Sequence, residues 1–220
     1  MKSFRPRLDS LPPEQRKLWP ELREVPSEFV LYGGTALALR LGHRISVDFD
    51  FFSSEPFQVA ELEKSLPFFE NPAVSQRKDN ALTFTIHRGK PIKLSFFGGI
   101  SFGRVGEPEK TEDGVLAVAS LLDLAGTKAS VVQMRAEVKD YRDVLALLNA
   151  GISLETLLAA GQALYADQLN PIISLKALSY FGDGDLSQLS AKEKATLTEV
   201  VRLVDRIPRL ERVSDRLSTE

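Results

Sequence analysis

LYGGTALALRLGHRISVDFDFFS (residues 31–53) places two carboxylates inside a stretch that otherwise has the pattern of a buried strand. FVLYGG (29–34) predicts a short buried strand that ends at glycines. TALALRLG (35–42) predicts a helix with Thr35 as its N-cap. ISVDFDFFS (45–53) alternates as a second strand. The order strand, helix, strand predicts an α/β fold.

The two carboxylates belong to Asp48 and Asp50, which are two residues apart and so point to the same face of the strand. Val47, Phe49 and Phe51 are predicted to point to the other face and to pack in the core. Neighbouring like charges raise one another's proton affinity unless a cation relieves them. Mg²⁺ is such a cation, because it binds through one or two carboxylates and substrate phosphates. An isolated Asp-x-Asp more often marks a strand that faces water.

The segment Gly33-Gly34-Thr35 precedes the carboxylates and lies between the predicted strand and helix. Backbone N–H groups and a helix N-terminus at this place can bind a phosphate. A Gly-Gly pair alone also fits a tight turn with positive φ. The combination of this turn with paired carboxylates fifteen residues later is more specific than either part, and it predicts a site for a metal ion and phosphates.

This stretch resembles the signature of the AbiEii-type nucleotidyltransferases, abortive-infection toxins of the polymerase-β-like superfamily. Their pattern is a Gly-Gly-Thr/Ser turn, a short helix, Arg-x-Ser and then Asp-x-Asp on a strand. The matching residues are Gly33, Gly34, Thr35, Arg44, Ser46, Asp48 and Asp50. The resemblance, which spans about residues 28–185, implies an α/β (α+β) polymerase-β-like fold: a small mixed sheet flanked by helices, with a C-terminal helical region.

A second segment resembles the same family through a Lys, an Arg seven residues later and a Lys-Asp pair. Here these are Lys128, Arg135, Lys139 and Asp140. At 3.6 residues per turn, the three basic residues fall on one stripe if their helix is continuous. Such a stripe would meet the phosphates of a nucleoside triphosphate. For Arg135 alone, an ordinary exposed helix face is the favoured interpretation.

The resemblance implies transfer of a nucleoside monophosphate from a nucleoside triphosphate to an acceptor hydroxyl, by a toxin of a toxin–antitoxin system. The implied acceptors are an RNA end such as that of tRNA, or a protein side chain, and a cognate antitoxin is an implied partner. Mg²⁺ or Mn²⁺ is the implied cofactor. The implied metal ligands are Asp48 and Asp50; the catalytic set adds Lys128 and Asp140; the nucleotide-binding set is Gly33, Gly34, Thr35, Arg44, Ser46, Lys128, Arg135 and Lys139.

The sequence departs from the family pattern where a third carboxylate is expected on a later strand. The matching strand is PIKLSFFGG (91–99), and the expected position holds Ser95. Serine neither binds Mg²⁺ strongly nor accepts a proton at neutral pH. Four explanations stay open: a slow enzyme, help from another acid such as Asp140, a shifted strand alignment, or lost catalysis. The alternative function is therefore a catalytically impaired family member that binds nucleotide or protein.

The composition of the 220-residue chain excludes several other classes. There is no cysteine, which excludes disulfides, a thiol nucleophile and cysteine-bound metals. The only two histidines, His43 and His87, lack metal-ligand spacing. No signal peptide is evident, and no apolar run approaches the roughly 20 residues that span a bilayer. We expect a soluble, cytoplasmic protein with no membrane partner.

The remaining sequence predicts a mixed half followed by a helical half. A helix is expected over about 13–24, strands around a turn at 88–90, and a long helical region over about 115–150, broken near Gly126 and near Glu137. The expected domains are an N-terminal extension (1–27), a nucleotidyltransferase core (28–112) and a helical region that completes the active site (113–220).

Overall fold

The computed structural model describes residues 2–219 and divides them into two compact units. Unit 1 contains the chain up to Ser120 together with the C-terminal segment from Ser214, and unit 2 is Leu121–Val213. The expected core 28–112 lies wholly in unit 1. Unit 1 also contains the segment that we expected as a separate N-terminal extension, so the contacts group residues 2–27 with the sheet.

Unit 1 is built on an eight-stranded mixed sheet with the strand order β1-β7-β8-β2-β3-β6-β5-β4. Its strands are β1 (Ser3–Phe4), β2 (Val30–Tyr32), β3 (Asp48–Phe52), β4 (Ala73–Lys78), β5 (Ala81–His87), β6 (Pro91–Phe97), β7 (Glu109–Thr111) and β8 (Ala117–Val118). Its helices are α1 (Pro13–Leu18), α2 (Gly33–Leu41) and α3 (Val59–Ser65), with short 3₁₀ helices η1 (Leu8–Ser10) and η2 (Trp19–Glu24). The mixed α/β fold expected from the sequence is confirmed.

The centre of the sheet determines where the carboxylates lie. Strand β3 pairs antiparallel with β2 and parallel with β6, and β6 continues into antiparallel β5 and β4. The turn expected at 88–90 is the β5–β6 hairpin, in which Gly89 has φ +108°. β3 is therefore an interior strand, held by a neighbour on each side.

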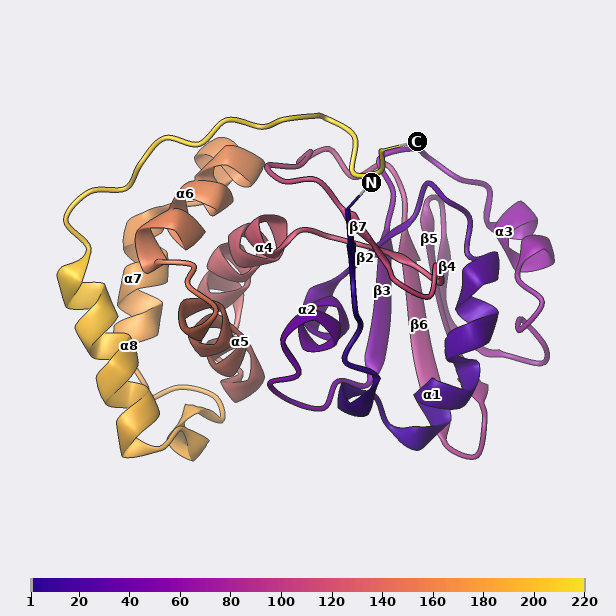
Figure 1. Cartoon of the computed structure of the whole chain (residues 1–220), viewed down its shortest axis with the longest axis horizontal. Coiled ribbons are helices and arrows are strands. Elements are labelled where there is room, and N and C mark those ends of the chain that lie inside the picture. Colours follow the sequence, from indigo (N-terminus) through magenta and orange to yellow (C-terminus); the bar gives the residue numbers. More distant parts are fainter. Residues whose placement is uncertain (1, 220) are drawn as a thin grey trace. The chain divides into compact units, whose positions relative to one another are not determined.

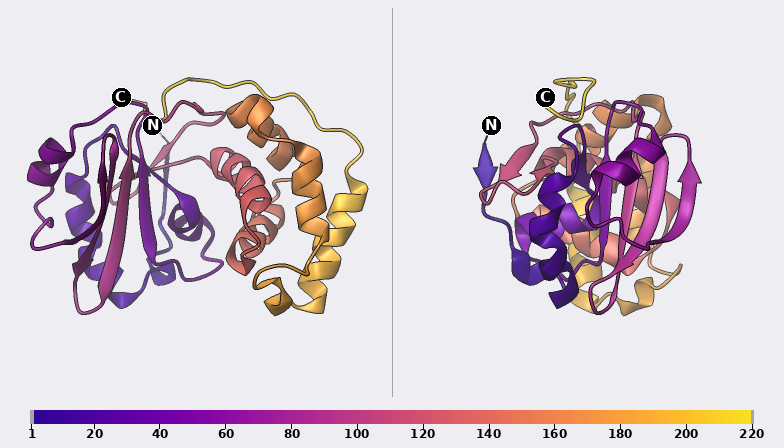
Figure 2. Two further views of the ribbon diagram at one scale, coloured as in Figure 1. Left: turned by 180° about the vertical axis from the view of Figure 1, so that it is seen from behind. Right: turned by 90° about the vertical axis from the view of Figure 1, so that its right-hand side faces the viewer.

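The two faces of β3 are chemically different, as the alternation predicted. Phe49 and Phe51 are fully buried, and the Phe51 ring stacks on Phe96 with their centroids 4.8 Å apart. Helices α1 and α3 lie on one side of the strands and α2 on the other (Figures 1 and 2). Val47 was wrongly expected in the core, because β3 begins one residue later and the Val47 side chain is 57% exposed.

Unit 2 is helical: α4 (Leu121–Met134), α5 (Val138–Asn149), α6 (Leu154–Tyr165), α7 (Pro171–Ser179) and α8 (Ala191–Leu203), with 3₁₀ turns η3 (Ala166–Gln168) and η4 (Leu186–Gln188). The break expected near Glu137 is confirmed, since Glu137 is the N-cap of α5. The break expected near Gly126 is wrong. A Cβ at Gly126 would lie 2.9 Å from the backbone of Ala160, so this glycine lets α4 and α6 pack closely.

The expected start of the long helix near residue 115 is also wrong. The chain first adds β8 to the sheet of unit 1, and α4 begins only at Leu121. Within residues 2–219, no single helix is long and apolar enough to cross a membrane. One pair of helical segments, Val138–Asn149 and Leu154–Gln168, is long and apolar enough when the two are taken together, but the chain bends by 115° between them.

The C-terminal segment after Ser214 is bound to unit 1 through Arg104. The backbone of Arg104 donates to the Ser214 carbonyl at 2.8 Å, and its Nη1 donates to the carbonyls of Arg216 and Ser218 at 2.7 and 2.9 Å. Leu217 is fully buried, and its N–H donates to the Ser54 hydroxyl. One guanidinium and one leucine therefore hold the segment in place.

Arg104→Ala is expected to release this segment. Loss of the two carbonyl contacts should raise the rate of tryptic cleavage after Arg216 about tenfold, because cleavage follows the population of the open state. The measurement is the time course of peptide release by mass spectrometry. Glu55→Ala is the control, since its ion pair with Arg216 is exposed and contributes little. Equal rates for wild type and Arg104→Ala would show that Arg104 does not hold the segment.

Candidate active site

The predicted carboxylates lie together on the face of the sheet opposite the aromatic core. Asp48 and Asp50 are both half-exposed and alternate with fully buried phenylalanines. Asp50 lies opposite Tyr32 on β2 and Ser95 on β6, and Asp48 lies opposite Lys93 on β6. Paired residues of neighbouring strands share a face. Two acids, a serine and a lysine therefore occupy adjacent positions on one face.

Helix α2 begins against these carboxylates. Gly33 has φ +74°, and a Cβ there would lie 2.9 Å from the Asp50 carboxylate oxygen Oδ2. A side chain at this position would be strained and would displace Asp50. The side chain of the N-cap residue Tyr32 makes no capping hydrogen bond to the first turn of α2. The helix N-terminus, with its partial positive charge, thus starts beside a carboxylate of β3.

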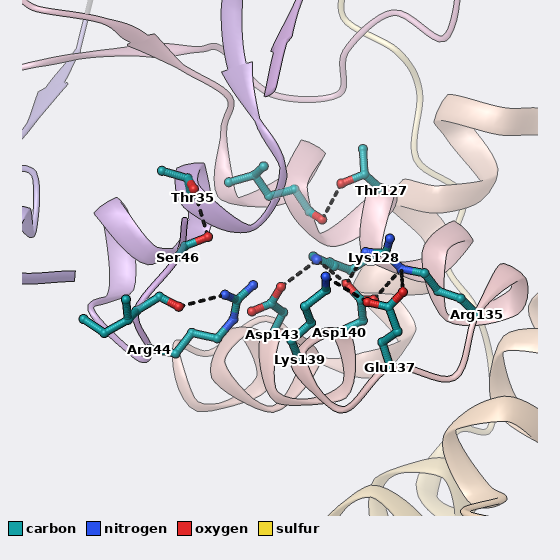
Figure 3. A network of polar contacts seen from close by, with 12 residues as sticks. Thr35, Arg44, Ser46, Thr127, Lys128, Arg135, Glu137, Lys139, Asp140 and Asp143 are labelled. Atoms are coloured by element: carbon teal, nitrogen blue, oxygen red, sulfur yellow. Dashed lines mark hydrogen bonds and ion pairs between the residues drawn. The ribbon is translucent and has the colours of Figure 1, made fainter. Parts of the chain in front are cut away.

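Thr35 was expected as the N-cap, and that expectation is wrong. The N-cap is Tyr32, and Thr35 lies buried in the first turn of α2. Its hydroxyl donates to the backbone carbonyl of Asp48 and lies 2.8 Å from the Ser46 hydroxyl (Figure 3). Thr35 therefore joins the helix to the strand at the backbone of Asp48, which sequence spacing alone did not indicate.

Arg44 and Ser46 lie over Gly34. A Cβ at Gly34 would collide with the Arg44 guanidinium and would lie 3.3 Å from the Ser46 hydroxyl. Arg44 Nη1 also donates to the carbonyl of Ile45 at 3.1 Å. The structure thus brings together all seven residues of the first motif within unit 1: Gly33, Gly34, Thr35, Arg44, Ser46, Asp48 and Asp50.

Asp48 and Asp50 fit a metal ion that the substrate helps to bind. Across residues 2–219, no three His, Cys, Asp or Glu side chains are grouped so that they could hold a metal. Two carboxylates are nevertheless a normal protein contribution to a Mg²⁺ site whose other ligands are waters and substrate phosphates. Ser95 is buried directly opposite Asp50. The register of β6 against β3 is therefore consistent with the alignment that puts Ser95 where the family pattern has its third carboxylate.

The second motif forms a buried ion cluster in unit 2. Lys128 Nζ lies 2.7 Å from Asp140 Oδ1 and 2.6 Å from Asp143 Oδ2 (Figure 3). Arg135 Nε lies 2.7 Å from Asp140 Oδ2. Both aspartates are fully buried, and the Lys128 side chain is only 6% exposed. Two cations and two anions therefore neutralise one another between α4 and α5.

The single cationic stripe expected for Lys128, Arg135 and Lys139 is wrong in its geometry. Lys128 lies within α4, Arg135 follows the end of α4, and Lys139 lies in the first turn of α5. Lys139 instead pairs with Glu137 at 2.8 Å. Arg135 and Lys139 remain 45% and 49% exposed, whereas Lys128 is buried.

The cluster also determines the ionisation of Asp140. Burial works to raise the pKa of its carboxyl, but the hydrogen bond from Arg135 and the charge of Lys128 outweigh burial and hold that pKa below its ordinary value. Asp140 is therefore a stable carboxylate that two cations hold. We did not single out Asp143 from the sequence, although its position three residues after Asp140 on a helix places it on the same face.

Lys128→Ala is expected to destabilise unit 2 strongly. It leaves two buried aspartates without their shared cation, which costs about 3–5 kcal/mol. Urea unfolding measures this loss, and Arg142→Ala is the control. Arg142 is 43% exposed and pairs with Glu193, so its removal should cost about 1 kcal/mol or less. Lys128→Met combined with Asp140→Asn and Asp143→Asn should recover stability. Equal losses for the two alanine variants would mean that the cluster does not hold α4 to α5.

Comparison with known proteins relates the chain to nucleotidyltransferases. The family model described as nucleotidyl transferase AbiEii toxin, type IV TA system, matches residues 19–215. An uncharacterised protein of Aquifex aeolicus (strain VF5), aq_aa25, is 31% identical over 180 residues, which is 76% of this chain and 85% of that protein.

Two solved Helicobacter pylori structures share the fold. One, described as a candidate nucleotidyltransferase, has a TM-score of 0.58 at 16% identity and covers 86% of this chain and 92% of its own. The other, JHP933, has a TM-score of 0.56 at 17% identity, with 86% and 88% covered. The AbiEii family model matches residues 19–215, which is most of this chain. The chain therefore belongs to the AbiEii family of nucleotidyltransferase toxins.

Proposed function

We propose that this chain transfers a nucleoside monophosphate from a nucleoside triphosphate to an acceptor hydroxyl, as the cytoplasmic toxin of a toxin–antitoxin pair. The observation that carries the proposal is the close approach of α2 to β3. Asp48 and Asp50 share one face, and Gly33 leaves room for Asp50 at the start of the helix. A carboxylate pair beside a helix N-terminus combines ligands for a cation with donors for an anion.

Asp48 and Asp50 are the residues that would hold Mg²⁺ or Mn²⁺. When bound, the ion supplies positive charge to the phosphates and offsets the repulsion between the two carboxylates. Thr35 positions this pair, because its hydroxyl binds the backbone carbonyl of Asp48. The carboxylates are thereby fixed relative to the first turn of α2.

The triphosphate would bind at that first turn. The backbone N–H groups of Gly33, Gly34 and Thr35 begin the helix, and the Arg44 guanidinium lies against Gly34. Backbone donors and one guanidinium together bind and orient phosphate oxygens. Ser46 contacts Thr35 and so supports the same turn.

In the reaction, the acceptor oxygen forms a bond to the α-phosphorus and the bond to the leaving pyrophosphate breaks in line. The hydroxyl proton must leave the acceptor oxygen, and because β6 offers Ser95 where a carboxylate would accept it, the proton passes to water. The roles predicted for Lys128, Arg135, Lys139 and Asp140 at the phosphates stay predictions.

Ser95 also favours a second candidate function, a nucleotide-binding or protein-binding module without catalysis. Its side chain is buried in register with Asp50, so no neighbouring carboxylate of β6 takes its place. A nucleotide-binding module shares the nucleotide site with the transferase and lacks only turnover, whereas a protein-binding module lacks nucleotide binding as well. They are therefore separated by measuring binding and transfer on the same samples.

Binding is tested by thermal unfolding with each nucleoside triphosphate and Mg²⁺. At a ligand concentration 100 times Kd, the folded state should gain about 2.7 kcal/mol, which appears as a rise in Tm. Replacing both Asp48 and Asp50 by Ala should abolish the rise. Asp79→Ala, a change in the β4–β5 turn, is the control that should keep it. An undiminished rise in the double variant would refute the carboxylate platform.

Turnover is tested by Ser95→Asp with a labelled nucleoside triphosphate and total tRNA. A general base contributes about 10²–10⁴-fold to rate, so wild type should transfer slowly and the variant faster. Ser95→Asn is the matched control, because it has nearly the size of Asp but cannot accept the proton. Rapid transfer by wild type, with Ser95→Asp neutral or harmful, would show that another residue is the base.

A further inference from the structure

Aromatic side chains continue the carboxylate face beyond Asp50. Phe52 follows Asp50 by two residues on β3, so it lies on the same face, about 6.6 Å further along the strand. Phe97 of β6 is paired with Phe52 in the register, two residues after Ser95. Both rings are only partly buried, whereas Phe51 on the opposite face is fully buried. The carboxylate face therefore carries partly exposed rings beside its acids, although the aromatic core of the sheet lies on the other face.

These rings contact one another at defined angles. Tyr32 of β2 is buried and stacks on Phe52, with their centroids 5.1 Å apart and an interplanar angle of 17°. Phe97 meets Phe52 edge-on at 5.7 Å. Phe102, from the loop after β6, meets Tyr32 and Phe52 edge-on at 5.8 and 6.2 Å. We call the three partly exposed rings, those of Phe52, Phe97 and Phe102, the aromatic shelf.

The loop that carries Phe102 is held by backbone hydrogen bonds to the end of β3. The N–H of Ile100 donates to the carbonyl of Ser53 at 3.0 Å. The N–H of Gly99 donates to the carbonyl of Glu55 at 3.2 Å, and Gly99 has φ +68°, a conformation that favours glycine. The ring of Phe102 is therefore placed by the backbone. A surface that is already ordered binds a flat ligand at a smaller entropic cost.

The order of groups along this part of the chain matches the order of groups in a nucleoside triphosphate. Ser46, which lies against Gly34 of the phosphate turn, comes first, the two carboxylates of Asp48 and Asp50 follow, and Phe52 comes last. In a nucleoside triphosphate, the ribose separates the α-phosphate from the base. A nucleotide with its phosphates at the first turn of α2 and its metal at the carboxylates therefore has its base beyond Asp50, at the aromatic shelf.

We propose that the aromatic shelf binds the base of the nucleoside triphosphate by stacking, with Phe52 as its central ring. This inference rests on the proposed function, because it requires the phosphates at α2. Every base has a π-face, so stacking on the shelf contributes affinity and orientation without selecting one base by hydrogen bonds. Phe52 thus binds substrate and holds the α-phosphate at the carboxylates, and it takes no part in bond formation.

The test compares two ligands by isothermal titration calorimetry with Mg²⁺: a nucleoside triphosphate, and inorganic tripolyphosphate, which has the phosphates but no base. Wild type should bind the nucleoside triphosphate about tenfold more tightly, the contribution of one stacked base. Phe52→Leu keeps an apolar side chain but removes the ring. It should bind each of the four nucleoside triphosphates about tenfold more weakly than wild type does, and tripolyphosphate equally well.

Three further variants control for packing. Phe52→Tyr keeps the ring and should keep most of the affinity. Phe97→Leu should weaken nucleoside triphosphate binding in the same direction, from a different strand. Phe69→Leu is the matched control, because Phe69 is a partly buried ring that packs edge-on against Phe84 on the opposite face of the sheet, and it should change neither affinity. The Tm of each variant without ligand shows whether it is folded.

Tripolyphosphate separates this inference from the proposed function. Equal affinity of wild type and Phe52→Leu for the nucleoside triphosphates would overturn the inference. A wild type that binds both ligands equally would also overturn it, because the base then adds nothing. Equal weakening of both ligands in Phe52→Leu would show that the ring supports the carboxylate strand and does not bind the base. A wild type that binds neither ligand would instead reject the proposed function, and the inference with it.

Discussion

The first turn of α2 packs so closely against β3 and the segment before it that ordinary side chains would clash there, and the candidate site depends on how this clash is avoided. Three consecutive residues solve the problem, two by lacking a side chain and one by a hydrogen bond. Gly33 has no side chain where the Asp50 carboxylate lies, Gly34 has none where the Arg44 guanidinium lies, and Thr35 hydrogen-bonds to the carbonyl of Asp48. The Gly-Gly-Thr pattern is thus a packing requirement as well as a phosphate turn.

The first motif could be located from the sequence, whereas the second could not be placed correctly. The first motif depends on strand alternation, which fixes the face of Asp48 and Asp50 whatever the surroundings. The second forms one stripe only if a single helix runs from Lys128 to Lys139, and the break expected near Glu137 already interrupts such a helix. The chain between Met134 and Val138 ends that helix, and Arg135 lies in the connection. No local sequence signal reports that Lys128 is buried, because burial of a lysine depends on partners from another helix.

Glycines show the same limit of local reasoning. Gly89 and Gly42 have φ values of +108° and +64° and terminate elements, as turn chemistry leads one to expect. Gly126 looks similar in the sequence but lies inside α4, where its missing side chain admits the backbone of Ala160. A glycine that ends a helix and one that admits another helix are distinguished only by what packs against them. Sheet order and the register of β6 against β3 were likewise beyond the sequence pattern.

The two sets of charged residues therefore have different physical characters. In unit 2, Lys128 and Arg135 neutralise Asp140 and Asp143 in an ion cluster, an arrangement that adds little net stability although removal of one partner is costly. In unit 1, Asp48 and Asp50 are half-exposed like charges on one strand, an arrangement that folding alone does not favour. A fold retains such repulsion where a ligand relieves it, and functional sites are where perturbing charge arrangements concentrate. The carboxylate pair of unit 1, rather than the ion cluster of unit 2, is therefore the arrangement that calls for a ligand.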